Sequence, residues 1–397
     1  MTVAAVDVGR TGAAEAVVDL AAVRANVRQV RRVVGPDVAV MAVVKADGYG
    51  HGMLPTARAA RQAGATWLGL ARVEEALALR DAGDEGRLLA WLLVPGQPGL
   101  VDAVAAGVDL SVSAAWTLAE IAGAARAAHR VARIHLKIDT GLGRNGATPA
   151  DWPGLARAAA AAADRGEVEV VGAWSHLACA DQPGHPSIAR QLAAFDEALA
   201  VLDRTGVTPQ VRHIANSAAA FTLPAARYDL VRPGIACYGL SPGPALGAPA
   251  ELGLRPAMTL RARLAGVKRV PAGHGVSYGH RYVTTRPTTL GLVPLGYADG
   301  VPRAASGVGP LQVGGVRFTV AGTVAMDQFV VDLGDLDVAP GDDVVLFGPG
   351  ERGEPTAADW AEATGTISYE IVTRLGPRVP RRYVDPADPA RAPQDRS

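Results

Sequence analysis

The 397-residue sequence predicts an α/β protein, with an N-terminal (β/α)8 barrel of the TIM type and a second, mostly β domain after it. Up to about residue 240, short β-branched runs alternate with Ala-rich helical segments, a pattern typical of a parallel sheet. About eight such strand–helix units occur, which favours a closed barrel over an open sheet. Past about residue 248 the helical periodicity fades, and short strands with turn signals follow. We therefore assign residues 14–247 to the barrel and 248–385 to the β-rich domain.

The composition of the chain excludes several classes of partner and predicts where the protein is located. Acidic and basic residues number 39 each, so neither nucleic acid nor a membrane is expected as a partner. The N-terminus has no signal-peptide pattern and no apolar stretch is long enough to span a membrane, which predicts a cytoplasmic protein. Two cysteines are too few for a disulfide framework or a zinc site, and no metal is expected. We expect residues 1–13 to pack with the second domain and the Pro-rich end, 386–397, to be disordered.

The individual elements follow from local patterns. Ala16 to Asp19 is predicted to be a strand, and Asp19 to cap the helix after it. One apolar face of that helix is formed by Leu20, Val23, Val27, Val30 and Val34. Further barrel strands are expected at 38–44, 66–71, 88–94, 108–112, 132–138, 168–175, 211–215 and 227–231. Helices are expected at 53–64, 73–82, 98–106, 115–128, 151–164, 185–204 and 217–223. Strands of the second domain are expected at 257–270, 288–295, 315–322, 328–333 and 343–348.

Residues capable of chemistry gather just after the barrel strands, where the active site of such a barrel lies. Lys45 ends one strand. The ends of four others carry the motifs HLKIDTGLGRNG (135–146), WSHLACADQ (174–182), HIANSAAA (213–220) and LVRPGIACYGL (230–240). One barrel mouth accounts for this clustering, whereas unrelated surface loops do not.

Lys45 follows a fully apolar strand and precedes the Gly-rich stretch Ala-Asp-Gly-Tyr-Gly-His-Gly. Burial at the end of a core strand lowers the pKa of an ammonium group, and only the free amine attacks an aldehyde to form a Schiff base. The alternative is a lysine that ends a strand with its amine in water, which composition alone favours. The neighbouring residues change this balance, because VVKADGYGHG closely resembles the pyridoxal 5′-phosphate attachment motif of the alanine racemase family.

The resemblance implies a complete binding site for pyridoxal phosphate. Asn216 and Ser217 read as a helix start that suits a phosphate, although a plain N-cap is equally compatible with them. The residues that the resemblance assigns to the phosphate are Tyr49, Asn216, Ser217, Gly234, Ile235 and Tyr369.

Arg232 matches the family's arginine at the pyridine nitrogen of the cofactor. A guanidinium group only donates hydrogen bonds, so it keeps that nitrogen unprotonated and the cofactor a weaker electron sink. Decarboxylases on the same barrel have a carboxylate at this position, so the arginine indicates racemisation. The alternative is a surface arginine after a strand.

Racemisation needs an acid–base group on each face of the planar intermediate. The resemblance implies Lys45 on one face and Tyr278, in GHGVSYGHRY, on the other. It also implies that His176, with Arg232 behind it, polarises Tyr278, whereas His176 taken alone reads as a core histidine. In the family this tyrosine reaches the site of the partner subunit, which implies a homodimer with shared sites.

The resemblance assigns the remaining positions to the substrate alanine and its path. Arg144 and the backbone of Met326 correspond to the carboxylate site, and Lys137 to a lysine that is often carbamylated. A carbamate would turn one of several crowded cations into an anion. The entrance is assigned to Asp181, Tyr297 and Arg303.

One segment departs from the family pattern. Where the family has Gly-Arg-x-Cys-Met-Asp-Gln, this chain has Gly-Thr-Val-Ala-Met-Asp-Gln at 322–328, so Thr323 replaces the arginine and Ala325 the cysteine. We expect this change to alter the entrance and to increase tolerance of serine.

Five motifs in the right order, over about residues 14–384, imply an alanine racemase that interconverts L- and D-alanine for peptidoglycan. A broader amino-acid racemase that accepts serine is the alternative within the same class. A non-catalytic pyridoxal-phosphate-binding protein is the alternative from another class, but such proteins lack the second domain with Tyr278 and Met326.

Overall fold

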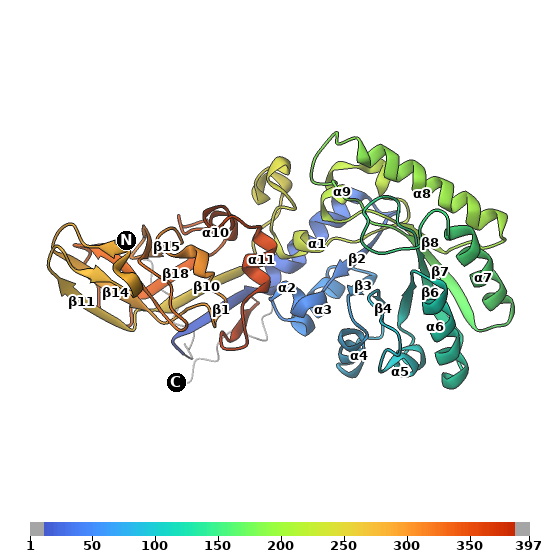
Figure 1. Cartoon of the computed structure of the whole chain (residues 1–397), viewed down its shortest axis with the longest axis horizontal. Helices are drawn as coiled ribbons and strands as arrows, with labels where there is room; N and C mark the ends of the chain where they lie inside the picture. Colours follow the sequence, from blue (N-terminus) through green and yellow to red (C-terminus); the bar gives the residue numbers. More distant parts are fainter. Residues whose placement is uncertain (1–11, 386–397) are drawn as a thin grey trace. The chain divides into compact units, whose positions relative to one another are not determined.

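The computed structural model describes residues 12–385, which form two compact units. Residues 23–255 make up the barrel unit, and residues 12–22 with 256–385 make up the second unit (Figure 1).

The barrel unit contains an eight-stranded parallel sheet in the order β8-β7-β6-β5-β4-β3-β2-β9. Its strands are β2 (Ala39–Val43), β3 (Trp67–Leu70), β4 (Arg87–Ala90), β5 (Asp109–Val112), β6 (Ala132–Lys137), β7 (Val168–Trp174), β8 (Val211–His213) and β9 (Leu230–Val231). Two backbone hydrogen bonds link the edge strands: Asp229 N donates to Arg212 O at 3.2 Å, and Arg232 N donates to Ala215 O at 2.9 Å. The sheet is therefore nearly closed, and the predicted barrel is confirmed.

Helices follow the barrel strands in alternation and cover the outside of the sheet (Figure 1). They are α1 (Leu20–Val34), α3 (Met53–Gln62), α4 (Val73–Asp81), α5 (Leu100–Ala105), α6 (Ala115–Ala128), α7 (Trp152–Asp164), α8 (Ser187–Arg204) and α9 (Ser217–Thr222). Asp19 caps α1 as predicted, since its Oδ1 accepts from Ala22 N at 3.0 Å. Short 3-10 turns follow at η1 (Pro224–Ala226), η2 (Ile235–Tyr238), η3 (Pro244–Leu246) and η4 (Pro249–Leu252). All seven helices predicted after the first are found within a few residues of their expected bounds.

The second unit is built on a nine-stranded sheet in the order β11-β14-β17-β16-β15-β18-β10-β1-β19. Its strands are β1 (Ala14–Asp19), β10 (Met258–Arg263), β11 (Gly266–Val270), β14 (Thr288–Val293), β15 (Pro310–Val313), β16 (Val316–Ala321), β17 (Phe329–Gly334), β18 (Asp343–Phe347) and β19 (Arg381–Val384). Outside this sheet lie the hairpin β12 (Gly275–Val276) and β13 (Tyr282–Val283), the turns η5 (Tyr278–His280) and η6 (Arg303–Ala305), and the helices α10 (Ala357–Thr364) and α11 (Ser368–Thr373). The mostly β second domain is confirmed, whereas the two helices were not predicted.

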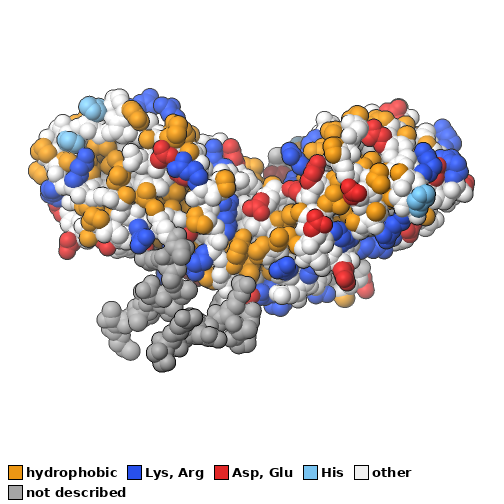
Figure 2. All heavy atoms as spheres, turned by 90° about the horizontal axis from the view of Figure 1, so that it is seen from below, with side chains coloured by type: hydrophobic (Ala, Val, Ile, Leu, Met, Phe, Trp, Pro, Cys, Tyr) orange, Lys and Arg blue, Asp and Glu red, His pale blue; other side chains and the backbone are white. Residues whose placement is uncertain are grey.

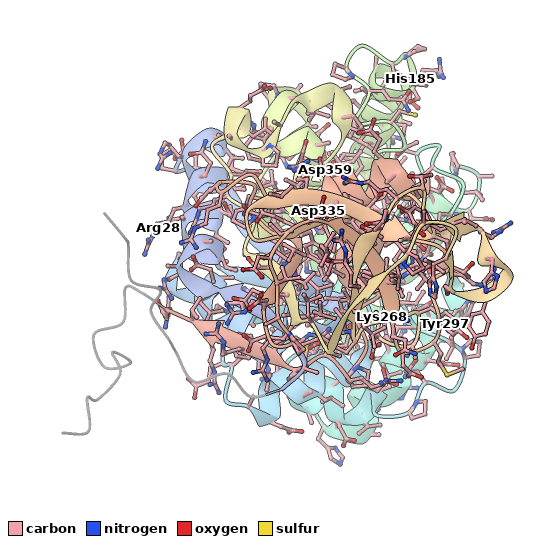
Figure 3. All side chains as sticks on the ribbon, turned by 90° about the vertical axis from the view of Figure 1, so that its left-hand side faces the viewer. Arg28, His185, Lys268, Tyr297, Asp335 and Asp359 are labelled. Carbon is pink, nitrogen blue, oxygen red and sulfur yellow. The ribbon has the colours of Figure 1, made fainter. Side chains whose placement is uncertain are left out.

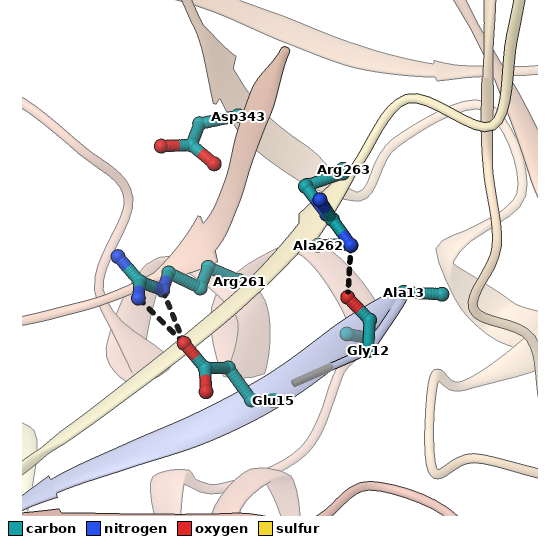
Figure 4. Close-up of a pocket in the computed structure, with 8 residues that line it drawn as sticks. Gly12, Ala13, Glu15, Arg261, Ala262, Arg263 and Asp343 are labelled. Carbon is teal, nitrogen blue, oxygen red and sulfur yellow. Dashed lines mark hydrogen bonds and ion pairs between the residues drawn. The ribbon is translucent and has the colours of Figure 1, made fainter. Parts of the chain in front are cut away.

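The first strand, β1, lies in the sheet of the second unit, so the assignment of residues 14–19 to the barrel was wrong. It pairs antiparallel with β10 and parallel with β19. Glu15 fixes this position, because its carboxylate accepts hydrogen bonds from Arg261 on β10 at 2.5 and 2.8 Å (Figure 4). It also accepts a hydrogen bond from Arg382 on β19 at 3.0 Å. The eight barrel strands are complete without β1. Residues 248–255, assigned to the second domain, lie in the barrel unit.

The chain ends and the surface complete the description. Residues 12 and 13 pack with the second unit, since Arg263 N donates to Ala13 O at 2.9 Å, while 1–11 and 386–397 lie outside the described residues. Acidic and basic side chains are interspersed on the face shown in Figure 2. Over residues 12–385, none of the helices combines the length and the apolarity that crossing a bilayer requires.

Candidate active site

Lys45 lies at the C-terminal end of β2, where it begins the turn α2 (Lys45–Tyr49). Ala46, Asp47 and Gly48 have φ angles of 53°, 53° and 60°, and Tyr49 also has a φ of 53°. Left-handed backbone costs about 1–2 kcal/mol for each residue with a side chain, so neighbouring groups must hold this turn in place. This left-handed turn was not predicted from the Gly-rich stretch.

Glu75, at the start of α4, stabilises the turn. Its Oε1 accepts from Ala46 N at 2.7 Å, and its Oε2 accepts from Ala71 N and Arg72 N at 3.0 and 3.1 Å. One carboxylate therefore accepts three charge-assisted hydrogen bonds and connects the backbone beside Lys45 to the end of the neighbouring strand β3.

Lys45 and Lys137 belong to a group of cations with Arg144 and Arg232, in which repulsion acts together with burial. Burial lowers the pKa of the Lys45 amine, and Arg144 lowers it further. Lys137, at the end of β6, is buried, and burial with Arg232 and Arg144 lowers its pKa to about 7. The Lys137 Nζ lies 4.2 Å from the centroid of the Trp174 ring. Both amines are therefore more often neutral near pH 7 than a lysine in water.

Arg232 is buried just after β9, so it is not a surface arginine. Its Nη1 donates to His213 Nδ1 at 3.0 Å, and its Nη2 donates to Ser175 O at 2.8 Å and to His176 Nδ1 at 3.2 Å. Burial and Arg144 lower the pKa of Arg232 to about 9, which leaves the guanidinium charged at neutral pH. Burial and Arg232 hold the pKa of His176 well below its usual value. His176 is therefore neutral, and because its Nδ1 accepts from Arg232, its proton is on Nε2.

Several residues predicted to hold a phosphate lie together at the ends of β8 and β9. Ser217, the first residue of α9, accepts on its Oγ from Gly234 N at 2.8 Å. A Cβ added to Gly234 would lie 2.2 Å from the Tyr49 hydroxyl oxygen, so only glycine fits this contact. Ile235 is buried at the start of η2. The Asn216 side chain accepts from the N–H of the third residue of α9 at 3.1 Å, so it acts as the N-cap of that helix.

Tyr278 begins η5 in the second unit, and 73% of its surface is exposed. Two hydrogen bonds fix its backbone. Thr323 Oγ1 donates to Tyr278 O at 3.0 Å, and Ser277 Oγ donates to Thr323 O at 2.6 Å. Thr323 is only 4% exposed. The threonine that replaces the family's arginine is thus buried within this unit and anchors the tyrosine segment.

The other predicted residues of the second unit are partly exposed. Met326 is 52% exposed, and its carbonyl accepts from Ala298 N at 2.9 Å, which sets it beside the turn of Tyr297, itself 45% exposed (Figure 3). Arg303 is exposed at the start of η6, and Tyr369 is half-buried in α11.

The predicted residues divide between the two units. The barrel unit carries Lys45, Tyr49, Lys137, Arg144, His176, Asp181, Asn216, Ser217, Arg232, Gly234 and Ile235. The second unit carries Tyr278, Tyr297, Arg303, Met326 and Tyr369. Contacts within the barrel unit bring Arg232 together with His176, and Tyr49 and Ser217 together with Gly234.

Sequence reasoning missed three neighbours of the site. His213 lies in the motif HIANSAAA but was not singled out, although a histidine at the end of a barrel strand was a sufficient signal. Glu75 occupies the third position after Arg72, where a capping-box glutamate is expected. Trp174 precedes Ser175 and has the guanidinium carbon of Arg232 4.8 Å from its ring centroid, a contact that a sequence alone does not reveal.

Comparison with known proteins agrees with this arrangement. Family models described as "Alanine racemase, N-terminal domain" and "Alanine racemase, C-terminal domain" match residues 18–242 and 257–383. The chain is 62% identical to an alanine racemase of Streptomyces coelicolor over 94% of this chain and 96% of that protein, and 61% identical to one of Frankia casuarinae over 93% and 96%. A crystal structure of alanine racemase from a D-cycloserine-producing Streptomyces lavendulae superposes with a TM-score of 0.93 at 60% identity, covering 95% of this chain and 98% of that one. The chain belongs to the alanine racemase family.

Proposed function

We propose that this chain interconverts L- and D-alanine with pyridoxal 5′-phosphate held by Lys45, in a homodimer whose sites are completed by Tyr278 of the partner. D-alanine made in this way would supply peptidoglycan synthesis. The observation that carries the proposal is the position of Lys45: a half-buried amine with a lowered pKa at the barrel mouth, after the strand β2 that pairs with β9, the strand before Arg232. A non-catalytic pyridoxal-phosphate-binding role is disfavoured, because the chain includes the second domain of the racemases.

The residues at the barrel mouth fit the cofactor. The Ser217 and Tyr49 hydroxyls, two donors that a phosphate could use, both lie beside the backbone of Gly234, and a side chain at Gly234 would collide with the Tyr49 hydroxyl. Arg232 offers a donor-only group to a ring nitrogen. When bound, pyridoxal 5′-phosphate withdraws electrons from the α-carbon of an attached amino acid and makes its proton labile.

Two groups of the protein would move that proton. Lys45 can accept it on one face because its lowered pKa favours the free amine. On the other face, the phenol of Tyr278 must first lose its own proton. His176 has its Nε2–H available as a donor, because its Nδ1 accepts from Arg232. Such a donor stabilises a phenolate and so favours Tyr278 as a base.

The substrate carboxylate would bind Arg144, which is exposed in the loop after β6, with the backbone of Met326. Lys137 is proposed to carry a carbamate. Its pKa of about 7 leaves a large fraction as free amine, whose nitrogen attacks CO2 and then releases a proton. The resulting anion would lie among Arg232, Arg144 and Lys45 and relieve their repulsion. Asp181, Tyr297 and Arg303 would line the entrance.

Borohydride reduction followed by peptide mass mapping tests the proposal. The sequence has three lysines, Lys45, Lys137 and Lys268, so the assignment is unambiguous. We expect a pyridoxyl group on Lys45 alone, and its loss in Lys45→Ala together with racemase activity. Lys268→Arg, an exposed position on β11, is the matched control and should keep both. A pyridoxyl group on Lys137, or on no lysine, would contradict the proposal.

A further inference from the structure

A line of polar side chains runs through the interior of the barrel and ends at Arg232. Arg232 Nη1 lies 3.0 Å from His213 Nδ1, His213 Nε2 lies 2.9 Å from His135 Nδ1, and His135 Nε2 lies 3.2 Å from Asp109 Oδ2. Asp109, His135 and His213 have no exposed surface, and Arg232 is 5% exposed. Asp109 begins β5 and Arg232 follows β9, so the line joins the N-terminal end of the barrel to its mouth.

The chemistry of the two ends sets the direction of every hydrogen bond in the line. Arg232 only donates, so His213 Nδ1 must accept, and the proton of a neutral His213 is then on Nε2. That proton is donated to His135 Nδ1, which leaves the proton of His135 on Nε2, facing Asp109. A carboxylate only accepts, so this last bond fits as well. Burial and Arg232 hold the pKa of His213 well below its usual value, which agrees with a neutral ring.

The charge of Asp109 is held in place by arginines. Arg133 Nε donates to Asp109 Oδ1 at 2.7 Å, and Arg87 Nη1 lies 3.6 Å from Oδ2. Arg133 in turn pairs with Glu169 at 3.0 Å. Asp109 is thus a compensated carboxylate whose Oδ2 is directed to the His135 ring.

The surroundings of the two rings are shaped to fit them. A Cβ on Gly172 would lie 2.1 Å from His135 Nδ1, so β7 makes room for this ring. Trp67 meets His135 edge-on with 5.2 Å between centroids, and Trp174 stacks on His213 at 5.6 Å with an interplanar angle of 8°. Apolar side chains usually fill a barrel interior, and a buried polar line is costly unless every member is paired. A role in the active site, at which the line ends, would explain why these polar side chains are buried in spite of that free-energy cost.

We propose that Asp109 and His135 are positioning residues of the racemase site, which act through His213 to fix the orientation and the donor role of Arg232. The inference rests on the proposed role of Arg232 at the ring nitrogen of the cofactor. Without Asp109, His135 and His213 lose the acceptor that fixes the positions of their protons, and Arg232 Nη1 loses a fixed acceptor in His213 Nδ1.

The first experiment is independent of catalysis. In full-length protein labelled with ¹⁵N-histidine, NMR distinguishes ring nitrogens that carry a proton from those that do not, and His135→Gln and His213→Gln assign the two rings. From the hydrogen-bond geometry we expect the proton of each ring to be on Nε2 and none on Nδ1. A proton on Nδ1 of either ring, or a doubly protonated ring, would overturn the proposal even if no other variant folds.

The second experiment tests the connection to the site in the holoenzyme. We expect Asp109→Asn and Gly172→Ala, which displaces the His135 ring, to shift the visible absorbance of the bound cofactor. The kcat should fall on the order of tenfold, the loss typical when a partner behind a working residue is removed, with little change in KM for alanine. Leu110→Val is the matched control, since Leu110 is a fully buried apolar neighbour on the same strand.

The control separates positioning from stability. The proposal requires that Leu110→Val lower the melting temperature without moving the absorbance or kcat. If Asp109→Asn leaves the absorbance unchanged, or if all variants lose activity only in proportion to their melting temperatures, the line has a structural role only. Failure of borohydride to label Lys45 would instead reject the proposed function and leave the assignment of the rings untouched.

Discussion

The Thr323 hydroxyl donates to the backbone carbonyl of Tyr278 at 3.0 Å, while 73% of the Tyr278 surface is exposed. A buried residue thus positions an exposed one. The Ser277 hydroxyl, which donates to Thr323 O at 2.6 Å, extends the connection into the segment before Tyr278.

Removing this hydroxyl tests its role. We expect Thr323→Val, which keeps the shape of the side chain, to lower the free energy of unfolding by about 1 kcal/mol. The kcat should fall several-fold, because Tyr278 loses its anchor. Thr323→Ser keeps the hydroxyl and serves as the control. Equal kcat values for Thr323→Val and wild type would show that Tyr278 is positioned by other contacts.

Thr323 also bears on the choice of substrate. The family's arginine at this position would be charged and too long for a site that is 4% exposed, so its side chain would have to extend out of the unit. We therefore expect wild type to use serine, relative to alanine, better than Thr323→Arg does. Comparable serine-to-alanine ratios of kcat/KM in the two proteins would reject the expectation, and melting curves control for misfolding.

The proposed two-base mechanism predicts an asymmetry between the enantiomers. In Tyr278→Phe, exchange of the α-proton with D2O should be lost from L-alanine to a greater extent than from D-alanine, because Lys45 is retained on its own face. Proton NMR of each enantiomer measures this exchange. Equal exchange from both would argue that Tyr278 is not the base on its face.

The lowered pKa of Lys137 predicts that the free energy of unfolding depends on pH. Its pKa is lowered from 10.5 to about 7 in the folded chain, so between these values the unfolded chain binds more protons. Stability from this group therefore increases with pH from about 7 to 10.5, by at most about 1.4 kcal/mol per pH unit. In buffer free of CO2, we expect the stability of wild type relative to Lys137→Met to rise over that window in urea unfolding. A constant difference across it would contradict the lowered pKa.

Glu75 is expected to be important for the turn beside Lys45. Glu75→Gln leaves one acceptor oxygen for the three backbone N–H groups of Ala46, Ala71 and Arg72, so we expect a loss of about 1–3 kcal/mol in unfolding free energy and weaker cofactor retention. Glu74→Gln is the matched control, since Glu74 is exposed and, within residues 12–385, accepts a hydrogen bond only from the Gln97 side chain, at 3.0 Å. Similar losses in both variants would mean that the turn does not depend on Glu75.

The sequence predicted the barrel well because its strands are continuous apolar runs and its helices are long and Ala-rich. It misplaced β1, because a strand pattern does not reveal the partner strand: the Glu15 contacts with Arg261 and Arg382 join residues more than two hundred positions apart. The left-handed backbone at Ala46 and Asp47 was also not predictable, since it depends on Glu75 from another element.

The residues of the candidate site were likewise predictable in part. Residues within motifs, such as Lys45 and Arg232, could be identified from the chain, and the burial of Arg232 was a finding of the structure. His135 opens the motif HLKIDTGLGRNG but was not singled out, and Asp109 lies in a strand for which no motif was noted. Their membership of the line that ends at Arg232 depends on contacts between strands, which the sequence alone does not reveal.

Subunit complementation tests the central claim, that Lys45 of one protomer works with Tyr278 of the other. Lys45→Ala and Tyr278→Phe would each be purified as inactive protein, mixed in equal amounts, dissociated and reassociated. If the sites are shared, each mixed dimer has one intact site, and the mixture should recover about a quarter of the wild-type rate. A mixture as inactive as its two parents would contradict the account.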